Sequence, residues 1–291
     1  MKKTIWSLAA LMLMAAPVMT SCSNDLDEVA RAEEVKSNIV TITIAPPVAE
    51  PETRVAMTGN VVTGWAENDE VILYKVTTTP DERRGTAIIN GTGVTFRCID
   101  AANGKFSGDL GSNNIDDYTF AVYGAVAANT DYDNIALAPK TMCSANLKDV
   151  VIMAAYKSGS TYTMQVVNNV LKVTNSGAAA EVAWSVTHYN TTLNPLPVYT
   201  LAPLSFYGWN MNSVAFGFLG MTGVETPAAY KGWANAKHFT LPNGVSYVTM
   251  GICANAKETW GLAKEDGTQV VTRKAMTGKV GVMGKIYSVS I

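Results

Sequence analysis

The stretch Val40-Thr41-Ile42-Thr43-Ile44 decides the fold class, because large aliphatic side chains alternate in it with polar ones. Neighbouring side chains of a β-strand point to opposite faces, so this stretch would have one apolar and one polar face. Further β-rich runs follow along the chain: Val71–Val76, Tyr118–Tyr123, Val166–Val167, Leu171–Val173 and Ala183–Val186. No segment has a sustained period of 3.6 residues with caps, as a helix would. The pattern therefore predicts an all-β protein.

Turn dipeptides separate these runs: Asn90-Gly91, Asn103-Gly104, Asn243-Gly244 and Asp266-Gly267. The last of them lies between the apolar runs 260–263 and 269–271, a spacing typical of a β-hairpin. Short strands joined by turns are the pattern of antiparallel β-sandwiches. The length of 291 residues suggests about two domains. We place their boundary at the polar stretch Lys157–Ser160 and expect two tandem sandwiches, at residues 38–157 and 158–291.

The composition excludes several classes of function. Charged residues make up 16% of the chain and hydrophobic residues 48%, whereas disordered chains are rich in charge and poor in apolar residues. The formal net charge of −2 and the pI near 5.8 lack the basic character that nucleic-acid binding needs. With two histidines and four cysteines, the chain has little capacity for metal sites or a disulfide framework.

The N-terminus has the pattern of an export signal. Lys2 and Lys3 precede the apolar stretch Ile5–Met19, which is typical of a signal peptide and short for a membrane span. Val18–Cys22 resembles a bacterial lipobox, so we predict a signal peptide at residues 1–21 and lipidation of Cys22; the alternative is a plain secretory cut. Residues 22–37 read as an acidic tether whose Asp25, Asp27 and Glu28 resemble the export signal of surface lipoproteins in Bacteroides-type bacteria, or form a solvated linker.

No set of residues predicts catalysis, and we expect neither an enzyme nor a cofactor. His188 and His238 lie far apart in the sequence and outside any metal-binding motif. Residues 129–134 place oxygen ligands as a calcium loop does, but lack its glycine and its bidentate glutamate. Beyond Cys22, the three cysteines Cys98, Cys143 and Cys253 have no CxxC spacing, so at most one pair could form a disulfide bond.

Three blocks of the sequence resemble the fimbrillin family, the lipoprotein subunits of Bacteroides-type (type V) pili. The first is Thr53-Arg54 with Trp65 and Asp69–Tyr74, where Trp65 reads as a core aromatic and Asp69 as a turn residue. The second is Phe106–Leu110 followed by Tyr118–Tyr123, although Gly124 stands where the family often has proline. The third is the closing run Gly284–Ile291.

This resemblance implies transthyretin-like sandwiches and assembly by strand exchange. Fimbrillins are cut after an arginine by a trypsin-like protease, which removes the first strand and opens a groove for a C-terminal strand of another subunit. The candidate cuts are Arg31-Ala32 and Arg54-Val55. We place Arg31 first because it lies in the tether, where a protease can reach extended backbone; Arg54 is the alternative, because only that cut would release the first strand. No processing at all remains a third outcome.

The two ends of the chain carry matching strand faces. Val40, Ile42 and Ile44 form an apolar i, i+2, i+4 face, and the residues Tyr287, Val289 and Ile291 have the same spacing. They are either the exchanging strands or ordinary strands of one closed domain. An extended peptide that adds to a sheet edge gains affinity from backbone hydrogen bonds and specificity from alternate side chains.

We therefore predict a structural or adhesive pilus subunit, lipid-anchored at the surface of the outer membrane and part of a fimbrium after maturation. Its expected partners are other pilus subunits, an arginine-specific maturation protease and a host or bacterial surface glycan or protein. The alternative is a glycan-binding surface lipoprotein, because exposed aromatic rings bind sugars. The aromatic candidates for that role are Trp184, Trp209, Trp233 and Trp260.

Overall fold

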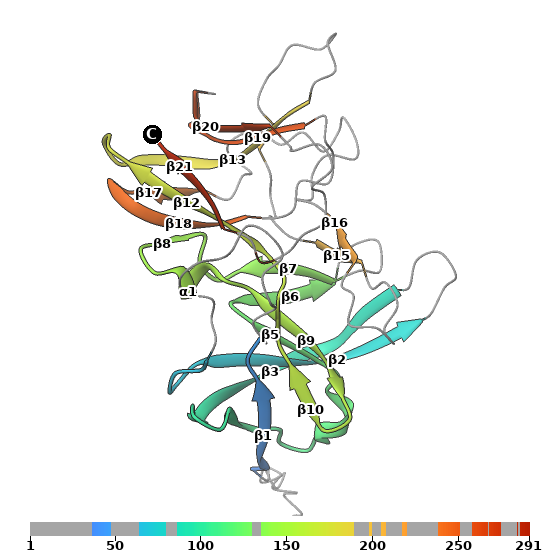
Figure 1. The fold of residues 1–291 in the computed structure, drawn as a ribbon. Coiled ribbons are helices and arrows are strands. Elements are labelled where there is room, and N and C mark those ends of the chain that lie inside the picture. Colours follow the sequence, from blue (N-terminus) through green and yellow to red (C-terminus); the bar gives the residue numbers. More distant parts are fainter. Residues whose placement is uncertain are drawn as a thin grey trace, which may run out of the picture. The chain divides into compact units, whose positions relative to one another are not determined.

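The computed structural model describes residues 37–47, 64–79, 86–129, 135–188, 198–199, 205–207, 217–219, 238–250, 258–266, 268–274, 284 and 286–291. These residues are almost entirely β-structure (Figure 1), with only a 3-10 turn η1 (Ile115–Asp117) and the short helix α1 (Leu147–Val150). The predicted all-β class is therefore confirmed. No helix in the described ranges is long and apolar enough to cross a membrane. The predicted signal peptide, Cys22 and most of the predicted tether lie outside these ranges.

The N-terminal sheet closes on itself. Its strands are β1 (Ile39–Ala45), β2 (Glu70–Thr79), β3 (Thr86–Asp100), β4 (Lys105–Asp109), β5 (Phe120–Tyr123), β9 (Met153–Ser158), β10 (Thr161–Thr163) and β11 (Gln165–Val166). Seven of them run in the order β10-β1-β4-β3-β2-β5-β9, and β9 pairs with β10 to complete a barrel-like ring. The eighth strand, β11, pairs antiparallel with β9. The sandwich that we expected here is thus not confirmed.

The stretch Lys157–Ser160 was expected to separate two domains, but it forms the hairpin between β9 and β10. Its polar residues suit an exposed turn as well as a linker. β10 and β11 consequently pair with the N-terminal sheet, although they lie beyond the boundary expected at 157/158.

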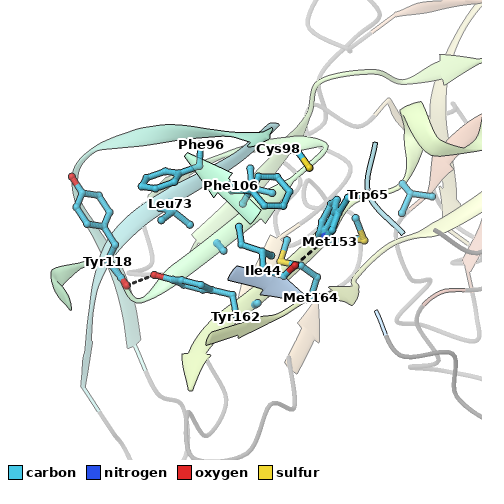
Figure 2. Packing of buried hydrophobic residues seen from close by; sticks show 14 of the residues in the cluster. Ile44, Trp65, Leu73, Phe96, Cys98, Phe106, Tyr118, Met153, Tyr162 and Met164 are labelled. Carbon is cyan, nitrogen blue, oxygen red and sulfur yellow. Dashed lines mark hydrogen bonds between the residues drawn. The ribbon is translucent and has the colours of Figure 1, made fainter. Parts of the chain in front are cut away.

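Two clusters of buried side chains lie on the two faces of this sheet. The inner cluster contains the large side chains Leu73, Phe96, Phe106, Tyr118 and Tyr162, together with Ile44 of β1 (Figure 2). The outer cluster packs Tyr74, Phe120, Val122 and Ile152 against β6 (Ala125–Asn129) and β7 (Ile135–Pro139). A small sheet in the order β16-β15-β7-β6 continues there with β15 (Ser205–Tyr207) and β16 (Gly217–Leu219).

The C-terminal residues form two further sheets. One has the order β21-β12-β18-β8, made of β21 (Ile286–Ser290), β12 (Asn169–Asn175), β18 (Gly244–Met250) and β8 (Cys143–Ser144). The other has the order β14-β13-β19-β20, made of β14 (Val198–Tyr199), β13 (Ala180–His188), β19 (Glu258–Ala263) and β20 (Gln269–Lys274), with β17 (Phe239–Leu241) beside β13. A third cluster joins Leu171, Val173 and Val248 of the first sheet to Val182, Trp184 and Leu262 of the second.

The hairpin predicted at Asp266-Gly267 is present, because β19 and β20 pair antiparallel on either side of it. Gly124, where the resemblance led us to look for proline, has φ +75°, and a Cβ there would run into the carbonyl of Val151. Proline is restricted to φ near −65°, so it could not occupy this position.

Asn168 is a buried polar residue that links β18 to the segment before β9. Its side chain accepts a hydrogen bond from the Ile152 N–H at 2.8 Å and donates to the Val150 carbonyl at 2.9 Å and the Thr249 hydroxyl at 2.7 Å. Loss of its hydrogen-bond partner by a buried polar group lowers the free energy of unfolding far more than the same loss at an exposed group.

Asn168→Ala is therefore expected to lower the free energy of unfolding by about 3 kcal/mol, because several buried backbone groups lose their partner. The matched control is Asn243→Ala, since Asn243 makes one exposed bond to the Gly177 carbonyl at 2.8 Å. That control is expected to cost less than about 1 kcal/mol. Urea denaturation measures both values, and equal losses would contradict the linking role of Asn168.

Candidate functional site

β1 is held between two different strands along its length. Residues Ile39–Thr43 pair antiparallel with Asp109–Lys105 of β4. Ile44 and Ala45 then pair parallel with Tyr162 and Thr163 of β10. β1 thus closes the ring between β4 and β10, so that taking it out would leave each of these two strands unpaired on one side.

The side chains of β1 alternate as the sequence pattern predicts. Ile44 is fully buried in the inner cluster, and Val40 and Ile42 are half-buried against the same cluster. Thr41 and Thr43 are exposed. The groove that holds β1 is therefore deepest at Ile44 and becomes shallower toward the N-terminal end of β1.

The backbone of β1 is fixed at its deep end by three hydrogen bonds. The Ile44 N–H donates to the Gly104 carbonyl at 2.9 Å, and the Met164 N–H donates to the Ala45 carbonyl at 3.0 Å. The indole Nε1–H of Trp65 donates to the Ile44 carbonyl at 2.8 Å, which Figure 2 draws as a dashed line. A side chain thus supplies one of the bonds by which the ring holds β1.

Trp65 is positioned by its ring contacts and by the turn that follows it. Trp65 is 8% exposed, and its ring meets Phe106 edge-on at 5.0 Å between ring centroids, with Tyr123 at 5.6 Å. In the following turn, the Asp69 carboxylate accepts hydrogen bonds from the Ala66 N–H at 2.7 Å and from the Lys148 ammonium at 2.6 Å. Asp69 therefore fixes the turn from which Trp65 enters the core.

Gly104 allows β1 to approach this end of the groove closely. Its φ is +60°, and a Cβ there would lie 2.5 Å from the Ile44 carbonyl oxygen. A side chain at Gly104 would have to displace the same carbonyl that Trp65 binds.

We expect Gly104→Ala to lower the free energy of unfolding by about 3 kcal/mol, from backbone strain together with the displaced carbonyl. Gly111→Ala is the matched control, because Gly111 has φ +56° and a Cβ there would meet nothing within 4 Å. That variant has the strain alone and is expected to lose about 1 kcal/mol. Chemical denaturation of both separates the two causes, and equal losses would show that contact with β1 contributes nothing.

The shallow end of β1 is fixed by Asp109. Its carboxylate accepts the Asn38 N–H at 2.8 Å and the Gly111 N–H at 2.9 Å, and the Leu110 N–H donates to the Asn38 carbonyl at 3.0 Å. The backbone bonds from Gly111 and Asn38 lower the pKa of Asp109. Because the folded pKa is lowered, this contribution is present above the ordinary carboxyl pKa of about 3.9 and is lost as the pH falls below it.

β21 is the edge strand of its sheet and pairs in parallel with β12 only, among the described strands. Tyr287, Val289 and Ile291 are half-buried against the third cluster. The strand is tied at its start, where the Gly284 N–H donates to the Asn168 carbonyl at 3.0 Å. At its end, the Ile291 carbonyl accepts from the Ser176 N–H at 2.9 Å and from the Ser176 hydroxyl at 2.8 Å.

Several predicted site residues lie outside the described ranges: Cys22, Arg31, Ala32, Arg54, Val55, Trp209, Trp233 and Cys253. Cys98 and Cys143 are free thiols. Asn129 of the calcium-like stretch instead binds the backbone of Ile89 through both side-chain atoms, at 2.7 Å and 2.9 Å. In the described part of the chain, no group of three or more metal-binding side chains gathers.

Trp184, a candidate sugar platform, is only 3% exposed, and its indole N–H donates to the Thr249 carbonyl at 3.0 Å. It cannot stack on a sugar ring, so the prediction is wrong for this residue. Sequence reasoning also missed Tyr162, Met164 and the contact between Trp65 and Ile44. The dipeptide Asn103-Gly104 was noted as a turn, but no local pattern indicates which distant strand such a turn will meet.

Comparison with known proteins finds similarity only at the level of solved structures. No protein-family profile and no curated protein matches the chain. Two proposed cell-adhesion proteins, from Bacteroides uniformis and Bacteroides ovatus, are each 13% identical to it with TM-scores of 0.36. They cover 78% and 87% of this chain, and 88% and 92% of their own.

The major pilin T3.2 of Streptococcus pyogenes is 11% identical with a TM-score of 0.17, over 87% of this chain and 97% of its own. TM-scores this low do not transfer a fold or a function to this chain.

Proposed function

We propose that this chain is a structural subunit of a cell-surface pilus that assembles by exchange of β1. The observation that carries the proposal is the position of β1, which closes a ring between β4 and β10 and fills its core with Ile44. A strand of seven residues with different partners at its two ends can be replaced by another strand without changing the order of the rest.

An empty β1 position would be a strong acceptor for a new strand. Removing β1 would leave unpaired the backbone groups of β4 that face it, and would deprive the Trp65 indole and the Gly104 carbonyl of their partners. Large buried side chains contribute roughly 1.5–3 kcal/mol each and ladder hydrogen bonds about 0.5–1.5 kcal/mol each. Three side chains and about five bonds give a gross gain on the order of 10 kcal/mol, before the cost of ordering the incoming strand.

The triggering cut is placed after Arg54. β1 spans Ile39–Ala45, so a cut after Arg54 disconnects it from β2, whereas a cut after Arg31 leaves it attached. This reverses the order in which exposure alone ranked the two arginines. The maturation partner is then an arginine-specific protease.

β21 is the donor in this account. Among the described strands it has one neighbour, β12, and it has an apolar face of the spacing that β1 presents. An edge strand leaves its sheet at lower cost than a central strand, because it breaks one ladder instead of two.

Before cleavage, the precursor is held at the cell surface by lipid on Cys22, at the outer membrane, and it becomes part of a fimbrium afterwards. Several acyl chains suffice for stable anchoring, at about 0.8 kcal/mol per buried methylene. In the alternative, a glycan-binding lipoprotein, the buried Trp184 cannot serve as a sugar-stacking platform. No contact among the described residues favours this alternative.

Limited digestion of unlipidated protein with an arginine-specific protease tests the proposal. The products are run on denaturing gels with and without boiling. The account predicts a ladder of polymers that boiling collapses to one trimmed subunit. A trimmed monomer without a ladder, which shifts in a glycan affinity gel, would contradict the pilus function and support the alternative.

A further inference from the structure

The segment Met142–Val151 leaves the N-terminal part of the protein and returns to it. It follows β7 of the small sheet and precedes β9 of the ring. Its strand β8 nevertheless pairs with β18, with Cys143 opposite Val248 and Ser144 opposite Tyr247, in the sheet that also contains β12 and β21 (Figure 1). We call this segment the strap, because it reaches from the ring to the C-terminal sheets.

The strap buries side chains in two different cores. Met142, at its start, is 6% exposed and belongs to the third cluster, and its carbonyl accepts the Thr249 N–H of β18 at 2.9 Å. Leu147, Val150 and Val151, around α1, are buried in the inner cluster of the ring. Burial of apolar side chains is favourable in proportion to the area removed from water, so each end of the strap is bound to a different part of the protein.

Two polar contacts fix the strap between these parts. The Lys148 ammonium donates to the Asp69 carboxylate at 2.6 Å, in the turn before β2. The side-chain amide of Asn168 donates to the Val150 carbonyl of the strap at 2.9 Å and to the Thr249 hydroxyl of β18 at 2.7 Å. One buried amide thus holds the strap and the C-terminal sheet together.

The inner cluster also continues beyond the ring. Val170 of β12 belongs to it, whereas Leu171 and Val173 of the same strand belong to the third cluster. Tyr247 of β18 and Ile286 of β21 are partly buried against the inner cluster as well. The ring and the C-terminal sheets therefore share buried apolar surface where the strap crosses between them.

We propose that the strap joins the ring and the C-terminal sheets into one cooperative unit, so that neither part opens without the other. Parts that share a strand and a buried core open together, whereas parts joined by an exposed linker open independently. The inference does not depend on how subunits assemble. In a pilus, it means that tension between the two parts acts on one unit and not on a hinge.

Native-state amide hydrogen exchange of the unlipidated full chain tests this inference. β5 reports on the ring and β18 on the C-terminal sheets, because each lies between two neighbouring strands. The perturbation is Leu110→Ala. Leu110 is 2% exposed in the inner cluster, and its N–H donates to the Asn38 carbonyl at the shallow end of β1, whereas the strap meets the turn that positions Trp65 at the deep end.

Leu110→Ala should accelerate exchange in β5 about thirtyfold or more, because the ring loses a buried leucine side chain. The proposal predicts the same factor in β18, which Leu110 reaches only through the shared core and the strap. Unchanged exchange in β18 would overturn the cooperative unit. Should Leu110→Ala fail to fold, Leu110→Val applies the same comparison with a smaller factor.

An insertion of Gly-Gly-Ser after Ala145 tests the strap itself. It lengthens the connection between β8 and α1, so that each can stay bound when the other is released. In this background, Leu110→Ala should accelerate exchange in β5 at least about tenfold more than in β18. The same insertion after Gly159, in the exposed turn between β9 and β10, is the control and should leave the two factors equal. Equal factors with both insertions would overturn the strap as the link.

Discussion

Arg54→Gln is expected to leave the protein monomeric after treatment with an arginine-specific protease, while Arg31→Gln forms the same ladder as the parent chain. A cut after Arg54 is the one that separates Ile39–Ala45 from β2. While β1 stays covalently attached, it competes at a very high effective concentration and excludes a donor from another molecule.

The two arginine variants differ by one substitution of the same kind, so each is the control for the other. Polymer content on unboiled denaturing gels is the measurement, and Arg54→Gln should reduce it at least tenfold. A ladder in Arg54→Gln together with its loss in Arg31→Gln would contradict the release of β1 and restore the cut after Arg31.

A subunit with Val289→Asp is expected to lose the ability to donate its β21 to another subunit. Its own β1 groove should still accept a strand. Val289 lies on the apolar face of β21, so with that face in the β1 groove a carboxylate at residue 289 would enter the inner cluster, where burial of an unpaired charge costs several kcal/mol. In its own sheet, Val289 is half-buried on an edge strand. We therefore expect Val289→Asp to destabilise the donor subunit itself less than it destabilises the assembled pair.

Val245→Asp serves as the control, because Val245 is 47% exposed on β18 of the same sheet. It should assemble like the parent chain. Cleaved Val289→Asp, added to cleaved parent, should shorten the ladder, since each variant copy can accept a strand but donate none. A full-length ladder from Val289→Asp alone would contradict the role of β21.

Local pattern predicted the elements of this protein better than their partners. The alternation at Val40–Ile44 and the dipeptide Asp266-Gly267 are local signals, and both led to correct elements. The closure of the ring depends on β10, a strand of three residues paired with β1 more than a hundred positions earlier, and so short a strand has no detectable period.

The same limit applies to the candidate site. The apolar face of β1 follows from its sequence, but the bond from Trp65 to Ile44 depends on a turn fixed by Asp69 and Lys148. Lys157–Ser160 has the composition of both a linker and a hairpin, and only the pairing of β9 with β10 distinguishes them. Tertiary contacts of this kind cannot be predicted from the spacing or composition of residues in the local sequence.

The N-terminal residue of the surface-assembled form is the most direct measurement of whether β1 leaves the subunit. Sequencing or intact mass of subunits released from isolated fimbriae by boiling provides it. The account predicts a chain that begins at Val55 and lacks Ile39–Ala45. A chain that begins at Ala32 or at lipidated Cys22, with β1 retained in the assembled subunit, would contradict it.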